Sequence, residues 1–310
     1  LQRRRLVVQG LVGAGADEQP VFAEDLVFHT RASAGSAGIF GRRDSRQQQE
    51  RTVAPWVMAE AVSVDDRQSL EGVGLLRITL DRDPAWPVPT PLAALGLTSD
   101  EAWDFMSELV RTLRLQGALT MPEGVQANDE VFAPRLGPIY ARLTGPDARR
   151  KVLSWLPARG TNRRIDYTSR VLAALGSTAD PAGVLEGVWR FLTSANGVDW
   201  LSSDLVKGLG EVRQVDHNLL RFELASSRAP VFVCDTCQRT APVAVRRVCP
   251  ALNCTGHLIM FVPPPEDAEQ DHYRSIYRSM LPVPLRAMEH TAQWQNTEAA
   301  RIQQEFIRGD

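Results

Sequence analysis

The chain has 310 residues, of which 44% are hydrophobic and 23% are charged, and its formal net charge is -2. These values are ordinary for a globular protein of about two or three domains, and they exclude a protein that is basic over its whole surface. No apolar run approaches the ~20 residues of a membrane span, and no signal peptide is visible, so we expect a cytoplasmic protein with no membrane partner. Because the chain begins at Leu1 and stops at Asp310 without a tail, we expect a piece of a longer protein.

Residues 1–86 are expected to form an N-terminal α/β segment. The stretch "RRRLVVQGLVGAG", residues 3–15, predicts a strand followed by a glycine turn. Its glycines do not make a phosphate-binding loop, because no Gly-Lys-Ser/Thr follows them. Residues 34–52 are rich in glycine, serine and polar side chains, which predicts a flexible loop.

Residues 87–148 are expected to form a winged-helix-like unit. A helix is predicted within residues 97–120, where Thr98 and Glu101 have the spacing of a capping box. The stretch "GALTMPEGVQANDEVFAP", residues 117–134, then alternates and turns as a short hairpin does. A helix followed by a hairpin favours a winged helix, although many small α+β folds share this order.

Two arginines of this helix are candidate nucleic-acid contacts. The apolar residues recur at helical spacing, at Trp103, Met106, Leu109, Val110 and Leu113. Arg111 and Arg114 lie off this apolar stripe. Phosphate binding is one interpretation of the pair, and solvated or salt-bridged side chains are the other.

Residues 149–229 are expected to form a helical unit or a second winged helix. One helix is predicted to begin at Thr161 or Asn162, and another at Asp180 with Pro181 in its first turn. Residues 210–224, "GEVRQVDHNLLRFEL", alternate as a paired strand does.

The start of the first of these helices carries an arginine pair. Arg163 and Arg164 could hold a phosphate together with the helix N-terminal amides, or they could be solvated or salt-bridged. Trp103, Trp189 and Trp200 are expected in the core rather than as base-stacking platforms.

All four cysteines of the chain lie within residues 230–262. Cys234 and Cys237 form a C-x-x-C pair, and Cys249 and Cys254 form a C-x4-C pair. Two such turns supply four thiolates to one tetrahedral ion, so the segment predicts a zinc ribbon with structural Zn²⁺. Four sulfurs close the coordination shell, which argues against catalytic zinc. His257 is an alternative ligand, and adventitious thiols or disulfides are the other interpretation.

The last segment contains "EHTAQ", residues 289–293, then a predicted helix that carries Arg301 and ends in "FIRG". This pattern resembles the start of the second RecA-like motor domain of superfamily-two DEAD/DEAH-box DNA helicases, and the cysteine pattern before it resembles the zinc module of large bacterial members. The resemblance covers residues 231–310, and it implies that residues 270–310 begin a truncated RecA-like domain with His290 near the nucleic acid or the interdomain cleft. For residues 87–224 it is architectural alone.

The chain also departs from that family. It has no G-x-x-x-x-G-K-[ST] loop, no D-E-x-[HD] run and no arginine motif of the second motor domain. ATP hydrolysis needs all three, so we expect the chain to be inactive alone and ATP with Mg²⁺ to bind only in the parent protein.

The leading hypothesis is therefore an α+β multidomain piece of an ATP-dependent DNA helicase or translocase. Its partners would be DNA and the remaining helicase domains of the same polypeptide. The alternative is a non-enzymatic adaptor that binds DNA or protein through winged helices and a zinc ribbon. A third interpretation is a purely structural scaffold.

Overall fold

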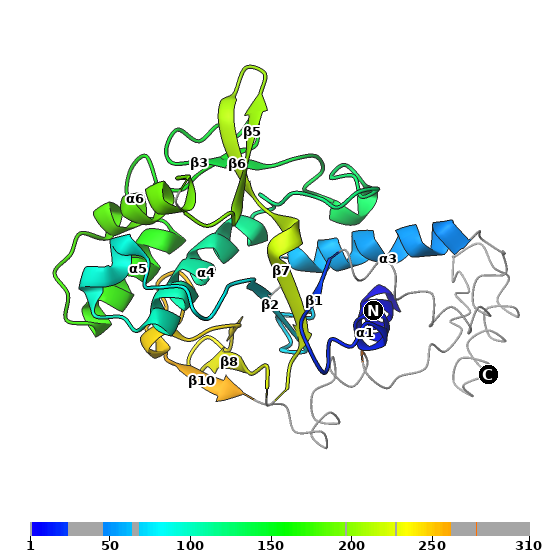
Figure 1. Ribbon diagram of the computed structural model, residues 1–310, viewed down its shortest axis with the longest axis horizontal. Coiled ribbons are helices and arrows are strands. Elements are labelled where there is room, and N and C mark those ends of the chain that lie inside the picture. The colour runs from blue at the N-terminus through cyan, green and yellow to red at the C-terminus, as the bar shows by residue number, and fades with distance from the viewer. Residues whose placement is uncertain are drawn as a thin grey trace, which may run out of the picture. The chain divides into compact units, whose positions relative to one another are not determined.

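The computed structural model describes residues 2–23, 46–63, 68–195, 197–226, 228–261 and Tyr277. They form a mixed α/β fold with several small sheets (Figure 1). The α-helices are α1 (Gln2–Gly13), α3 (Arg46–Ala61), α4 (Ser99–Leu115), α5 (Arg163–Ala174) and α6 (Pro181–Leu192). The 3-10 helices are η2 (Thr90–Leu95), η3 (Glu130–Phe132), η4 (His217–Leu219) and η5 (Val245–Arg247). The expected RecA-like start at 270–310, with His290, lies outside the described residues except for Tyr277.

Two three-stranded sheets hold the first and last parts of the described chain. The first has the order β1-β7-β2 and joins β1 (Val21–Phe22), β7 (Leu220–Leu224) and β2 (Leu76–Leu80). The second has the order β10-β8-β9 and joins β10 (Leu258–Phe261), β8 (Val231–Cys234) and β9 (Thr240–Ala241). All neighbours in both sheets are antiparallel.

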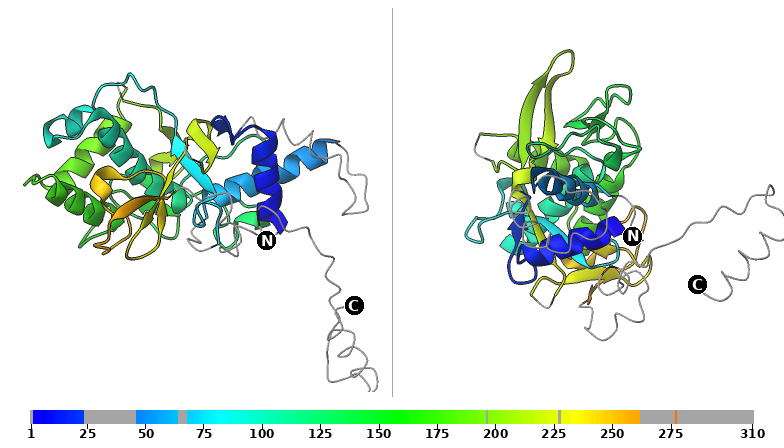
Figure 2. Two further views of the ribbon diagram at one scale, coloured as in Figure 1. Left: turned by 90° about the horizontal axis from the view of Figure 1, so that it is seen from below. Right: turned by 90° about the vertical axis from the view of Figure 1, so that its right-hand side faces the viewer.

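The third sheet has four strands in the order β4-β3-β6-β5. It joins β4 (Val152–Ser154), β3 (Tyr140–Arg142), β6 (Gly210–Val215) and β5 (Leu201–Val206). The β3 and β4 strands are parallel, whereas β6 runs antiparallel to both β3 and β5. The β5–β6 hairpin extends beyond the helices beside it (Figures 1 and 2).

Three helices begin where the sequence predicts. At α4 the Thr98 side chain accepts the Glu101 N–H at 3.2 Å, and the Glu101 carboxylate accepts the Thr98 N–H at 3.0 Å, which completes the capping box. Asn162 caps α5 through the Ile165 N–H, and Asp180 caps α6, whose first residue is Pro181. Local side-chain hydrogen bonds therefore set these boundaries.

Three local predictions are wrong. The loop expected at residues 34–52 is wrong for residues 46–52, which belong to α3, while residues 34–45 lie outside the described residues. Residues 3–15 do not form a strand, because α1 covers Gln2–Gly13 and buries Val7, Val8 and Leu11 along one face. These spacings suit a helix better than a two-residue period. Residues 117–134 form turns and η3 instead of a hairpin. The prolines in this segment have no N–H to donate to a strand ladder.

The tryptophans belong to the core, as the sequence analysis expects. Trp103, Trp189 and Trp200 are 3%, 7% and 1% exposed. The rings of Trp103 and Trp200 lie 5.4 Å apart between centroids in an edge-to-face arrangement. The indole N–H of Trp200 donates to the Asp81 carbonyl at 2.8 Å. This pair therefore joins α4 to the start of β5 and to the residue that follows β2.

A buried ion network fixes α4 against the turn at residues 69–75. The Glu71 carboxylate accepts from Arg111 Nε at 3.1 Å and from Arg114 Nη2 at 2.9 Å. Arg111 also bonds Glu108, and Arg114 also donates to the Ala61 carbonyl of α3. Burial alone would raise the pKa of Glu71, but the charges of the two arginines hold that pKa below its usual value. The carboxylate therefore stays ionised near neutral pH.

We expect Glu71→Ala to lower the free energy of unfolding by about 3–5 kcal/mol, because it leaves two buried guanidinium groups without their shared carboxylate. The stabilisation by Glu71 is present above the carboxyl pKa of the unfolded chain and is lost as pH falls through the lower folded pKa. Urea unfolding at several pH values measures both effects.

The matched control is Glu186→Ala, which removes a half-exposed carboxylate paired with Arg190 on α6. That change should cost less than about 1 kcal/mol. Equal effects of the two substitutions would show that the buried network does not stabilise the fold.

Candidate metal centre

The four cysteines converge at one end of the β10-β8-β9 sheet. Cys234 ends β8 and Cys237 follows in the next turn, while Cys249 and Cys254 flank a second turn. Their ligand atoms all lie within 4.8 Å of one another. The Sγ atoms of Cys234 and Cys254 are 3.7 Å apart, and those of Cys237 and Cys249 are 3.6 Å apart. A tetrahedral zinc ion with Zn–S bonds of about 2.3 Å places its sulfurs about 3.8 Å apart.

The two turns direct backbone N–H groups at the sulfurs. Cys234 Sγ accepts from Thr236 at 3.4 Å and from Cys237 at 3.5 Å. Cys249 Sγ accepts from Ala251, and Cys254 Sγ accepts from Gly256, both at 3.5 Å. Donors aimed at sulfur stabilise the thiolate form that a metal ion requires.

The close approach of the two turns requires a glycine. A Cβ at Gly256 would lie 2.5 Å from Cys234 Sγ, 2.6 Å from Thr236 Oγ1 and 2.7 Å from the Asp235 carboxylate. Any larger residue would displace the first turn from the second. Gly256 therefore keeps the four sulfurs within reach of one ion.

The thiols do not share one protonation behaviour. Burial raises the pKa of Cys249, whereas at Cys234 burial is outweighed by the N–H donors of Cys237 and Thr236, which lower that pKa. All four cysteines are free, so the disulfide interpretation is not what the geometry shows. The cluster does not include His257, whose Nδ1 faces the Asp235 carboxylate at 3.9 Å. The arrangement is thus compatible with a four-sulfur zinc site.

One arginine of α5 holds the second cysteine turn. Arg170 Nη1 donates to the carbonyls of Cys249 and Cys254 at 2.5 Å each, and its Nη2 donates to the Ala251 carbonyl at 2.8 Å. Asp166, four residues earlier, accepts from Arg170 and from the Asn253 N–H. The Arg170 guanidinium therefore connects the second cysteine turn to α5.

Three further contacts attach the cysteine-bearing segment elsewhere. The Thr240 hydroxyl donates to the Glu71 carbonyl at 2.8 Å, and Arg77 donates to the Pro242 carbonyl at 3.1 Å. Arg246 pairs with Glu101 at the start of α4. The segment is thus bonded to the turn before β2, to β2 itself, to α4 and to α5.

Arg111, Arg114 and Arg164 are all buried and bonded inside the fold. For these three arginines the burial favours a role within the fold over phosphate contact, the other interpretation of the sequence. Arg111 and Arg114 belong to the Glu71 network. Arg164 is 3% exposed and donates to Trp155, Ser154 and Thr112. Burial lowers the pKa of Arg164 to about 10. Arg163 is partly buried and donates to the Pro250 carbonyl at 2.8 Å, so it too contacts the cysteine turn.

The sequence analysis missed Arg170 and Asp166. Their spacing of four residues predicts an ordinary ion pair on a helix surface. Nothing in the local sequence indicates that the guanidinium would meet three carbonyls about 80 residues further along the chain.

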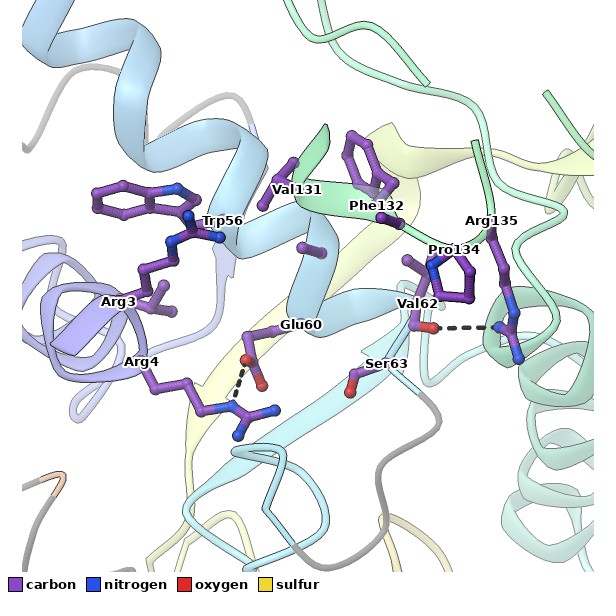
Figure 3. Close-up of a pocket in the computed structure, with 13 residues that line it drawn as sticks. Arg3, Arg4, Trp56, Glu60, Val62, Ser63, Val131, Phe132, Pro134 and Arg135 are labelled. Carbon is purple, nitrogen blue, oxygen red and sulfur yellow. Dashed lines mark hydrogen bonds and ion pairs between the residues drawn. The ribbon is translucent and has the colours of Figure 1, made fainter. Parts of the chain in front are cut away.

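A cavity of about 390 Å³ lies between α1, α3 and the segment around η3 (Figure 3). Trp56, Phe132 and Pro134 form part of its wall, and Arg3 and Arg135 add positive charge. The Glu60 carboxylate accepts from Arg4 Nε at 2.7 Å and from the Leu70 N–H at 2.9 Å. The Glu60 carboxylate therefore stabilises the fold by joining α3 to α1 and to residue 70, and we assign no catalytic or binding role to the cavity.

No protein-family model matches the sequence, and neither a curated protein nor a solved structure matches it. None of the described helices is both long enough and apolar enough to cross a membrane.

We expect the purified chain to hold a single zinc ion. Substitution of Cys249 by serine should abolish that stoichiometry and lower the melting temperature, because the small cysteine-bearing sheet has little apolar core of its own. Metal analysis after gel filtration, with thermal unfolding in parallel, measures both. His257→Ala is the control and should retain the ion, and loss of zinc from that variant would make His257 a ligand.

We expect Arg170→Met to lower the free energy of unfolding by about 2–4 kcal/mol, because three carbonyls lose their donor. The side-chain stem is retained, so the loss reports the guanidinium. Zinc should still bind, but a chelator should remove it faster from the variant than from the unmodified chain. The control is Arg190→Met, an exposed arginine on α6, and an equal effect there would contradict the bracing role of Arg170.

Proposed function

We propose that this chain is the accessory and partial motor region of an ATP-dependent DNA helicase or translocase. In this proposal the described residues bind DNA, and a structural zinc ion braces the DNA-binding elements. The phosphate loop and the metal-binding acids would lie elsewhere in the parent protein, so the chain alone would bind DNA without hydrolysing ATP.

The observation that carries DNA binding is the order and pairing of elements between α4 and β6. After η3, the order is strands β3 and β4, helices α5 and α6, and then the β5–β6 hairpin, all of them following helix α4. Strand β3 pairs with β6, the second strand of the hairpin. Apart from the added parallel strand β4, this order supports a winged helix, in which α5 and α6 would be the helix-turn-helix and the hairpin would be the wing. A single unit of this kind would span the boundary at 148/149, which the sequence predicts to separate two units.

Zinc would act on this unit through α5. The second cysteine turn is bonded to Arg170 and Asp166, which lie on the first helix of the proposed helix-turn-helix. A closed four-sulfur shell leaves no coordination position for a water nucleophile, so the ion would have a structural role. Loss of the ion would release the contacts that position α5.

The motor assignment rests on the resemblance of residues 231–310 to superfamily-two helicases. Its most specific part, "EHTAQ" with Arg301 and "FIRG", lies outside the described residues. A non-enzymatic adaptor would share the winged helix and the zinc site. The two differ in the parent protein, which as a helicase must hydrolyse ATP in a DNA-dependent manner.

We expect the chain to bind a duplex with a single-stranded tail at a Kd of about 10⁻⁶ M at low salt, and the logarithm of the binding constant to fall linearly with the logarithm of salt concentration. Fluorescence anisotropy with a labelled duplex measures this. The matched comparison is the zinc-free Cys249→Ser chain, which should bind more weakly. Absence of binding at about 50 mM salt would reject the DNA-binding proposal.

A further inference from the structure

The positive charge of the proposed winged helix lies around its hairpin, not on its helix pair. On α6 the described cation is Arg190, which pairs with Glu186 at its own helix surface. On α5 the arginines at 163, 164 and 170 donate to backbone carbonyls of the fold. A surface that meets phosphate must therefore be sought elsewhere in the unit.

Residues 140–151 and 201–215 carry six basic and three acidic side chains, in a chain whose net charge is -2. The basic residues are Arg142, Arg149, Arg150, Lys151, Lys207 and Arg213. We call this set the hairpin cations. Both lysines of the chain belong to it, although arginine supplies all of the other 33 basic side chains among the 35 of the chain.

Two of these cations reach the turn of the hairpin. Arg142 donates to the Leu209 carbonyl, and Arg150 donates to the Gly208 carbonyl. Both guanidinium groups therefore lie against the turn that contains Lys207. Lys151 donates to the Leu136 carbonyl in the adjoining loop. These bonds occupy part of each cationic group and fix its position; Arg150 and Lys151 are exposed, whereas Arg142 is half-buried.

The acidic residues in the same segments leave a positive excess. Asp147 lies 3.9 Å from Arg150, and Glu211 pairs with Arg213. Burial raises the pKa of the Tyr140 phenol, and the negative charge of nearby Asp204 raises it further. Arg149, Lys151 and Lys207 are all exposed, and no carboxylate of the described part of the chain forms an ion pair with them.

We propose that the hairpin cations bind the phosphate backbone of duplex DNA, with Lys151 and Lys207 as the two central contacts. This inference rests on the proposed DNA-binding function and names the surface that performs it. A lysine ammonium is a compact charge with three rotatable donors, which suits contact with single phosphates along a strand. The exposed guanidinium of Arg150, which lies against the turn that contains Lys207, would extend the contact to a neighbouring phosphate.

Leu205 adds an apolar contact at the same place. It lies two residues before Lys207 and is 80% exposed, which makes it the most exposed of the large hydrophobic residues described. An apolar side chain beside phosphate-binding cations fits the sugar or base edges of a groove. Loss of this contact should weaken binding without changing its salt dependence, because no counterion is released by a leucine.

The test uses the full chain and the double variant Lys151→Gln/Lys207→Gln. Glutamine removes the charge but keeps a polar side chain with a hydrogen-bond donor, and it leaves the positive φ of residue 151 (56°) equally strained in both proteins. We expect duplex affinity to fall at least tenfold at low salt and the salt slope to become shallower by about 2, as two lost phosphate contacts predict. Lys151→Arg/Lys207→Arg should restore binding, and Leu205→Ala should lower affinity at an unchanged slope.

The control for charge is Arg3→Gln/Arg159→Gln, which removes the same charge from two exposed arginines on other segments. Since the chain has only two lysines, amine acetylation followed by mass spectrometry gives a direct footprint of the surface. Duplex DNA should protect Lys151 and Lys207 while the α-amino group stays reactive.

The outcomes separate the inference from the proposed function. If the wild-type chain binds DNA and the lysine-to-glutamine pair weakens binding no more than the Arg3→Gln/Arg159→Gln control does, the hairpin surface is overturned and DNA binding is kept. The same conclusion follows if bound DNA leaves both lysines reactive. No binding by the wild-type chain would reject DNA binding itself. Protection by polyglutamate at equal charge, without protection by duplex, would assign the surface to an acidic protein and overturn the inference.

Discussion

The buried ion pairing of the Glu71 carboxylate with two arginines is the interaction on which the rest of the fold depends. Its oxygens accept from Arg111 and Arg114 on α4, and its backbone carbonyl accepts from Thr240 in the cysteine-bearing segment. One residue thus joins the turn before β2, the central helix and the proposed zinc module. A buried charge cluster costs desolvation, so its effect is better described as fixing which elements meet than as adding net stability.

The cysteine turns show a second way of joining distant parts. Arg170 satisfies three carbonyls of the loop that carries Cys249 and Cys254, and Gly256 lets the other turn approach. An ion held by the four sulfurs would therefore act on α5 as well as on its own sheet. Such coupling makes metal content and helix position interdependent in the proposed DNA-binding unit.

Sequence reasoning succeeds here where the signal is local. The caps at Thr98, Asn162 and Asp180 and the cysteine spacing depend on residues within a few positions of each other. It does not decide between phosphate contact and ion pairing for Arg111 and Arg114, because a helical stripe divides apolar from polar faces but does not reveal that α4 is covered on both. The carboxylate that neutralises them lies about 40 residues earlier in the chain. The strand predicted for the residues of α1 is wrong for a different reason, since a short apolar run fits both the helical and the strand periodicity.

Strands β2 and β7 have a consequence for how the molecule can be divided. Leu80 and Leu220 face each other in their antiparallel ladder, so the 139 positions between them leave and return at one point. Topologically this stretch is an inserted cassette whose ends would accept a short turn or a fusion partner. Electrostatically it is not separable, because excision would leave Arg111 and Arg114 without the carboxylate of Glu71. The boundary at Leu80 and Leu220 therefore crosses few chain connections but separates Glu71 from its two arginine partners. A version of the cassette that folds alone would need those two arginines replaced by neutral side chains.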